Sequence, residues 1–163
     1  MIVYHGSTEI IKNPDVLHSK KYLDFGKGFY ITTFENQAKK WAVRKGMRQE
    51  KTAIVNIYEL SEKWDDYRVL PFEKENEKWL DFVCGCRKGQ PLNEAFDIII
   101  GNVADDDVFK TVDMYFRGLW DKEKVLNELR YYKMNNQLCI VNQKTLNQLI
   151  TFKRSYEVKS NGR

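Results

Sequence analysis

A short apolar run, FDIII at residues 96–100, constrains the fold of this chain more than any other segment. The run is continuous and ends at Gly101, which is typical of a β-strand that is buried on both faces. Other elements must therefore cover this strand from two sides. Strand-like and helix-like patterns elsewhere follow one another without a regular alternation, so we expect a single α+β domain over residues 1–163.

Five further segments combine β-branched and aromatic residues in the way that strands do. They cover residues 2–5, 29–32, 53–60, 137–141 and 151–158. Helices are predicted between them because apolar residues recur at spacings of three and four. These helices begin behind Thr32, at about Glu73, after residues 104–107, at Asp121 and, as a short segment, at residue 143.

The helix behind the second strand has the clearest start signal. Thr32 and Glu35 have the spacing of a capping box, in which each side chain satisfies a backbone N–H of the first turn. The residues expected to share one face of this helix are Phe34, Ala38, Trp41 and Ala42.

The composition is that of a globular chain, with 42% hydrophobic and 31% charged residues. No apolar run reaches the length of a membrane span, and the N-terminus lacks the pattern of a signal peptide, so we expect a cytoplasmic protein without membrane contact. Cys84, Cys86 and Cys139 are odd in number and lack metal-ligand spacing, which argues against a disulfide framework and a metal site. A net charge of +4 does not by itself indicate nucleic-acid binding.

Two motifs carry more specific information, YHGS at residues 4–7 and FGKGFYIT at residues 25–32. In this order and at this spacing they resemble the nucleotide-binding core of ADP-ribosyltransferases, in the branch shared by poly-ADP-ribose polymerases and diphtheria toxin. Over nearly its whole length the chain also looks like an uncharacterised bacterial family of small stand-alone domains in this superfamily. The resemblance implies split antiparallel β-sheets flanked by helices, and NAD⁺ as the co-substrate.

The resemblance also implies roles for particular residues. His5 would bond a ribose hydroxyl, and Tyr30 would stack on one face of the nicotinamide ring. The main chain of Gly6 would pair with the nicotinamide carboxamide, where a side chain would block close approach, and Ser7 would add a hydroxyl contact. Trp41 falls where a second stacking aromatic is expected. The ligand-binding set is completed by Gly28 and Phe29 of the second motif.

Each of these residues also has a purely structural interpretation. A histidine at a strand end, such as His5, is commonly an ordinary hydrogen-bonded side chain. Aromatic residues such as Tyr30 and Trp41 usually belong to the core. Their combination with the HGS motif and the paired glycines is what favours the NAD⁺ site. His18 lies in no motif and is expected at the surface.

The third element of the family is usually a glutamate at the start of a late strand, where it binds the ribose and favours the oxocarbenium ion. In NNQLCIV, residues 135–141, Gln137 occupies that position. Glutamine can hold the ribose hydroxyl but lacks a full negative charge. His5, Tyr30 and Gln137 are therefore the expected catalytic set of a variant that transfers single ADP-ribose units. In the alternative interpretation, Gln137 is a surface residue of an edge strand.

Two pairs of charged residues near the predicted site lie outside any motif. Asp105 and Asp106 follow the apolar strand and could replace the missing acid, but capping of the next helix explains them as well. Arg44 and Arg48 lie one and two turns beyond Trp41 and could reach a pyrophosphate, although a solvated helix face explains them equally.

The sequence favours two functions of different class. The first is an NAD⁺-dependent mono-ADP-ribosyltransferase that modifies a protein or nucleic acid; family analogy suggests a bacterial toxin or defence effector with an antitoxin partner. The second is a non-catalytic module that binds NAD⁺ or ADP-ribose, which the neutral side chain of Gln137 favours. Release of nicotinamide from NAD⁺ would separate the two.

Overall fold

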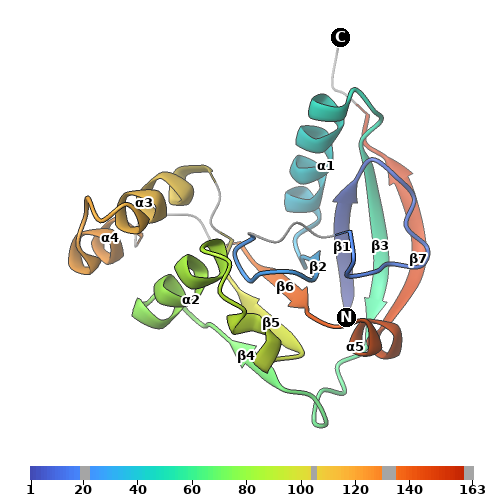
Figure 1. The fold of residues 1–163 in the computed structure, drawn as a ribbon. Helices are drawn as coiled ribbons and strands as arrows, with labels where there is room; N and C mark the ends of the chain where they lie inside the picture. Colours follow the sequence, from blue (N-terminus) through green and yellow to red (C-terminus); the bar gives the residue numbers. More distant parts are fainter. Residues whose placement is uncertain (19–22, 104–105, 130–134, 160–163) are drawn as a thin grey trace.

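Two β-sheets form the centre of the molecule (Figure 1). The computed structural model describes residues 1–18, 23–103, 106–129 and 135–159. The antiparallel sheet β1-β3-β7 consists of β1 (Ile2–Ser7), β3 (Ile54–Leu60) and β7 (Ile150–Glu157). The sheet β2-β6-β5-β4 consists of β2 (Phe29–Ile31), β6 (Gln137–Ile140), β5 (Ile98–Gly101) and β4 (Val69–Pro71). Its β4–β5 pair is parallel and its other two pairs are antiparallel.

The backbones of the two sheets meet at a bridge between Tyr4 and Thr32. The Tyr4 N–H donates to the Thr32 carbonyl at 2.8 Å, and the Thr32 N–H donates to the Tyr4 carbonyl at 3.0 Å. Strand β1 pairs with β3 over its whole length, and β2 pairs with β6. Beyond the bridge, β1 and β2 therefore separate. The expected α+β fold with split, largely antiparallel sheets is thereby confirmed.

The helices cover the outer sides of the sheets (Figure 1). The first, α1 (Glu35–Gln49), packs along β1 and β3. Three others gather beside the four-stranded sheet: α2 (Glu77–Arg87), α3 (Asp106–Phe116) and α4 (Lys122–Leu129). α5 (Gln143–Leu149) contacts β6 and β7, and the short 3₁₀ helix η1 (Leu92–Ala95) packs against α2. Within the described ranges, no helix is long and apolar enough to cross a membrane.

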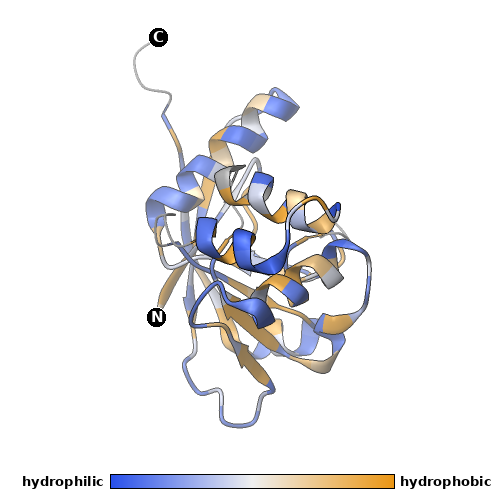
Figure 2. Cartoon of the chain, turned by 90° about the vertical axis from the view of Figure 1, so that its left-hand side faces the viewer, coloured by the Kyte–Doolittle hydropathy of each residue, from blue (hydrophilic) through white to orange (hydrophobic). Residues whose placement is uncertain are grey.

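Strand β5 separates the two large clusters of buried side chains. Ile98 belongs to the cluster that includes residues of β1, β3 and α5, whereas Ile99 belongs to the cluster beneath α2, α3 and α4. Successive residues of a strand point to opposite faces, and both isoleucines are fully buried. The double-sided burial predicted for this strand is therefore confirmed. Figure 2 shows the strands largely in the colours of hydrophobic residues, whereas the helices carry both hydrophobic and hydrophilic residues.

The start of α1 differs from its prediction. The helix begins at Glu35, and Phe34, in the N-cap position, makes no capping bond with its side chain. Thr32 instead donates its hydroxyl proton to the side-chain oxygen of Asn136 at 2.8 Å, and the carboxylate of Glu35 accepts a bond from the Tyr156 hydroxyl at 2.6 Å. The capping box is therefore wrong: Thr32 accepts its local bond from the Phe34 N–H at 3.1 Å, ahead of the helix, and the Glu35 carboxylate is held by Tyr156, which is distant in the sequence. Phe34 is 44% exposed and does not belong to the buried face.

The segment before β5 contains two elements that the sequence did not predict, β4 and η1. Pro71 ends β4, an edge strand, where a residue without a backbone N–H is tolerated. Helix α2 begins at Glu77, four residues after the predicted start at Glu73. Asn76 sets this boundary, because its side chain accepts a bond from the Trp79 N–H at 3.0 Å.

Candidate functional site

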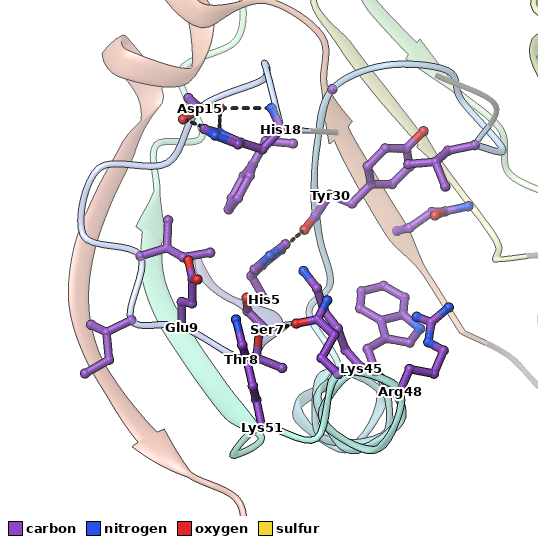
Figure 3. A pocket seen from close by; sticks show the side chains of 18 of the residues that line it. His5, Ser7, Thr8, Glu9, Asp15, His18, Tyr30, Lys45, Arg48 and Lys51 are labelled. Atoms are coloured by element: carbon purple, nitrogen blue, oxygen red, sulfur yellow. Dashed lines mark hydrogen bonds and ion pairs between the residues drawn. The ribbon is translucent and has the colours of Figure 1, made fainter. Parts of the chain in front are cut away.

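A cavity of about 1280 Å³ opens where β1 and β2 separate. Its walls come from β1, β2, α1, the ends of α2 and β6, and the loops that follow β1 and precede β2 (Figure 3). The predicted site residues that line it are His5, Ser7, Gly28, Phe29, Tyr30, Trp41 and Gln137. Ligand pockets commonly measure about 300–1,000 Å³, so this cavity has room for a dinucleotide.

His5 connects the two sides of the split. Its Nδ1 lies 2.6 Å from the carbonyl oxygen of Tyr30 (Figure 3), and its ring stacks on Phe29 with 4.5 Å between the centroids. A carbonyl only accepts, so Nδ1 carries the proton and Nε2 keeps its lone pair. Burial lowers the pKa of His5 to about 4, and the charge of Lys45 acts in the same direction. At neutral pH His5 is thus an uncharged ring that can accept a bond from a hydroxyl group.

Gly6 is not among the residues that line the cavity. A Cβ at this position would lie 2.2 Å from the Ala38 carbonyl oxygen and 2.7 Å from the Ala42 nitrogen of α1. The close packing of β1 on α1 therefore requires a glycine at this position. We expected the glycine to make room for a ligand, but a side chain here would meet α1 instead. The N–H and C=O of Gly6 point to the same strand edge as those of Tyr4, two residues earlier, and that edge faces the split.

Tyr30 offers a ring but no reactive hydroxyl. Its hydroxyl donates to the Gly26 carbonyl and accepts from the Phe25 N–H at 3.0 Å. Burial raises the pKa of the Tyr30 phenol well above its usual value, so the group stays protonated. These bonds hold the ring at the cavity wall, where it also packs against the buried cluster beneath α2, α3 and α4. Tyr30 therefore combines a core contact with a ring at the cavity, and its hydroxyl is not suited to act as an acid or base.

The glycines of the second motif serve the fold around Tyr30. Gly26 has a φ of +75°, a conformation that side chains rarely adopt. At Gly28 a Cβ would lie 2.4 Å from the sulfur of Cys139, because the chain here lies directly on β6. Phe29 lines the cavity but is only 5% exposed, and its ring stacks on that of His5, so its main role is in the core.

Trp41 and Ser7 complete the part of the cavity near α1. Trp41 is half-buried on α1 and lies across the split from the strand that carries Tyr30, so the fold brings both expected stacking residues to one cavity. Ser7, at the end of β1, is 2% exposed. The interpretation of Trp41 as an ordinary core residue is not supported, because no buried cluster includes it among the described residues.

Gln137 lines the cavity and is 4% exposed. Its strand, β6, lies between β2 and β5, so the alternative of a surface residue on an edge strand is wrong. The Gln137 Nε2 donates to Asp24 Oδ2 at 3.0 Å, and Asn102 O lies at 3.4 Å. Asp24 is 8% exposed and also accepts two bonds from the guanidinium of Arg87.

Asp24 and Arg87 are site residues that sequence reasoning missed. Asp24 immediately precedes the FGKGFYIT motif, and this position next to Phe25 was the one available signal. Arg87 had none, because a basic residue in the last turn of a helix such as α2 is ordinary.

Basic side chains line the part of the cavity beside α1. Lys45 and Arg48 extend from α1, and Lys51 follows it, as Figure 3 shows. No carboxylate in the described part of the chain forms an ion pair with these three residues. Arg44, which was also considered for a pyrophosphate, is not in the cavity lining.

Three further acidic or histidine positions were considered from the sequence. Asp105 lies outside the described residues, and Asp106 begins α3 but its side chain also lies outside the described part. His18 is at the cavity mouth with its side chain 90% exposed, paired with Asp15 at 2.7 Å, so the expected surface position is confirmed.

The fold and the cavity define a small α+β protein with a polar, aromatic-lined cleft between two sheets. A family model described as "Protein of unknown function (DUF3990)" matches residues 1–152, and the chain belongs to this family. No curated protein and no solved structure matches the chain.

Proposed function

We propose that the protein binds NAD⁺ in the cavity between β1 and β2 and transfers ADP-ribose to a macromolecular acceptor. The observation that supports this most is the convergence of His5, Tyr30 and Gln137 on one cavity from three segments of the chain. These are the three positions that carry the resemblance to ADP-ribosyltransferases. Trp41 and Tyr30 would hold the nicotinamide ring between them, and His5 Nε2 would accept a bond from a ribose hydroxyl.

The reaction requires little covalent chemistry from the protein. The bond between ribose C1′ and the nicotinamide nitrogen breaks, and both electrons leave with neutral nicotinamide. The remaining oxocarbenium ion is captured by an oxygen, nitrogen or sulfur atom of the acceptor, which loses its proton to solvent. The protein's contribution is to orient the ribose and to place electron-rich groups beside the developing positive charge. His5 and Gln137 are available for both tasks, because each presents an acceptor atom without a formal charge.

The basic side chains beside α1 support a dinucleotide over a single nicotinamide. Lys45, Arg48 and Lys51 line the same cavity as Trp41. The acids among the described lining residues are Glu9, Asp15 and Asp24. Asp15 is paired with His18 and Asp24 with Arg87, so the exposed Glu9 is the acid that remains to balance the three basic residues. A pyrophosphate carries two negative charges and would lie favourably along this side.

A second function, a module that binds NAD⁺ or ADP-ribose without cleaving it, is favoured by the neutral amide of Gln137. An amide stabilises an oxocarbenium ion less than a carboxylate does. The binding contacts required by this module are the same as those of the enzyme.

Nicotinamide release tests the two functions against each other. The purified protein is incubated with NAD⁺, alone and with cell lysate, and free nicotinamide is measured by chromatography. Calorimetry with NAD⁺ is run in parallel. Release supports the transferase, and binding without release supports the module. If the protein neither releases nicotinamide from NAD⁺ nor binds NAD⁺ or ADP-ribose in calorimetry, both functions are wrong.

A further inference from the structure

We propose that Asp24 is the acid of this site and that it acts through Gln137 as a positioning residue. The inference rests on the proposed function and adds to it the source of the negative charge that Gln137 lacks. It assigns the role to a residue of the loop before β2, which lies 113 positions before Gln137 in the sequence but contacts it in space.

The hydrogen bonds around Gln137 fix the orientation of its amide. Both neighbours on the side of Nε2, the Asp24 carboxylate at 3.0 Å and the Asn102 carbonyl at 3.4 Å, can only accept. The amide nitrogen must therefore face them, and Oε1 is the atom left for a ligand in the cavity that Gln137 lines. A ribose hydroxyl donating to Oε1 would thus be held by an amide whose N–H is bonded to an anion. A charge-assisted bond of this kind polarises the amide and makes its oxygen a stronger acceptor.

Arg87 supplies the positive charge that faces the Asp24 carboxylate. This buried carboxylate faces the guanidinium of Arg87 through Oδ1 and the amide of Gln137 through Oδ2, so its charge is paired and both oxygens accept hydrogen bonds. The two oxygens thus have different tasks: one anchors the group on α2 and the other acts on the site.

The other carboxylates that line the cavity are less suited to this role. Glu9 is exposed, so water screens its charge. Asp15 is paired with the exposed His18 at the cavity mouth. Among the described lining residues, Asp24 is the buried acid in contact with a predicted catalytic residue.

A charge exchange between the two positions tests the inference. Asp24→Asn leaves two amides in contact, Gln137→Glu places two carboxylates in contact, and the double variant restores one amide and one carboxylate in exchanged positions. We expect Asp24→Asn to lower kcat for nicotinamide release by about tenfold or more while KM for NAD⁺ changes by less than about threefold. The double variant should recover most of the lost kcat. Gln137→Glu alone should add an ionisation to the pH–rate profile, because the two carboxylates share a proton.

Asp97→Asn is the matched control. Asp97 is a little-exposed acid that pairs with Arg68 and accepts a bond from Asn142, and it lies outside the cavity lining. Its loss should cost stability, measured by thermal unfolding, and leave kcat unchanged. If Asp24→Asn does not fold, Gln137→Met keeps the Asp24–Arg87 pair and should lower kcat by a similar factor.

The outcomes separate this inference from the proposed function. If the wild type releases nicotinamide and folded Asp24→Asn keeps its kcat, or if Gln137→Met keeps it, Asp24 does not act through Gln137 and the inference is wrong, while the transferase stands. If the double variant stays as slow as Asp24→Asn, the inference is also wrong. Absence of NAD⁺ binding by the wild type overturns the proposed function and this inference together.

Discussion

The imidazole of His5 bonds the main chain of Tyr30 across the split, with 2.6 Å between Nδ1 and the carbonyl oxygen. One strand of each sheet is therefore tied to the other by a side chain at the point where their backbones separate. The bond also fixes the tautomer, so the atom left for a ligand is the acceptor Nε2. The His5 ring therefore joins the two sheets through Nδ1 and is proposed to bind the ribose through Nε2.

His5→Ala should abolish nicotinamide release and cost about 1 kcal/mol of stability, because a partly buried hydrogen bond and a stacking contact with Phe29 are lost. His5→Gln retains a polar side chain and should recover part of the stability but little of the activity. Release is measured by chromatography and stability by urea unfolding. Wild-type turnover in the alanine variant would contradict the assignment of His5.

The stability of the protein should fall as the pH falls from about 6.5 toward 4. His5 has a folded-state pKa of about 4, below the ordinary 6.5, so in this window the unfolded chain binds a proton that the folded protein does not. Above pH 6.5 the residue is neutral in both states and contributes no slope. Urea unfolding of the wild type and of His5→Gln between pH 4 and 7 measures the difference. Parallel curves for the two proteins would show that His5 is not the group responsible.

Trp41→Ala should weaken NAD⁺ binding by about 1–3 kcal/mol through the loss of a stacking surface, with the fold intact. Trp41 is half-buried and outside the core clusters, so little core packing is lost. Trp41→Phe keeps an aromatic ring and should retain most of the affinity. Calorimetry measures binding and thermal unfolding measures stability. A large loss of stability would instead assign Trp41 to the core.

Lys45→Gln and Arg48→Gln should each weaken NAD⁺ binding by about 1–2 kcal/mol at low salt, with a smaller effect at high salt. Lys40→Gln is the matched control, because Lys40 lies exposed on the same helix and outside the cavity lining. Titrations at two salt concentrations distinguish the three variants. Equal losses in all three would mean that only the net charge matters.

Gly6→Ala should destabilise the protein by about 1–3 kcal/mol or more, because its methyl group meets backbone atoms of α1 that cannot move alone. Gly118→Ala is the comparison: Gly118 has a φ of +74°, but open space surrounds the position that a methyl group would take, so its cost should be about 1 kcal/mol. Chemical unfolding measures both. A smaller loss for Gly6→Ala than for Gly118→Ala would contradict the packing argument.

The sequence predicted the elements whose signals are local. The two motifs, through their resemblance to ADP-ribosyltransferases, predicted that His5, Tyr30 and Trp41 share one site, and all three line the cavity. The apolar run containing Ile98 and Ile99 predicted a strand buried on both faces from its pattern alone. Such signals depend on strand and helix periods, which the chain carries in short windows.

Contacts between distant segments were not predictable in the same way. Thr32 bonds Asn136, 104 positions away, and this contact displaced the capping box. Asp24 and Arg87 are 63 positions apart, and neither belongs to a periodic pattern that indicates the other. Gly28, expected in the ligand-binding set, lines the cavity, but the sequence did not indicate that the chain at this glycine lies directly on Cys139 of β6. Sequence shows that space is short at such a position and does not show what fills it.

The backbone bridge between Tyr4 and Thr32 determines how amide hydrogens near the cavity exchange with solvent. These two N–H groups bond across the junction of the sheets, so an opening limited to the split would expose them while the centre of β3, paired on both sides, stays protected. A ligand that contacts His5 on one side of the junction and Gln137 on the other would hold that opening closed. Deuterium uptake at Tyr4 and Thr32 is thus a direct report of occupancy, one that requires no turnover and no knowledge of the acceptor.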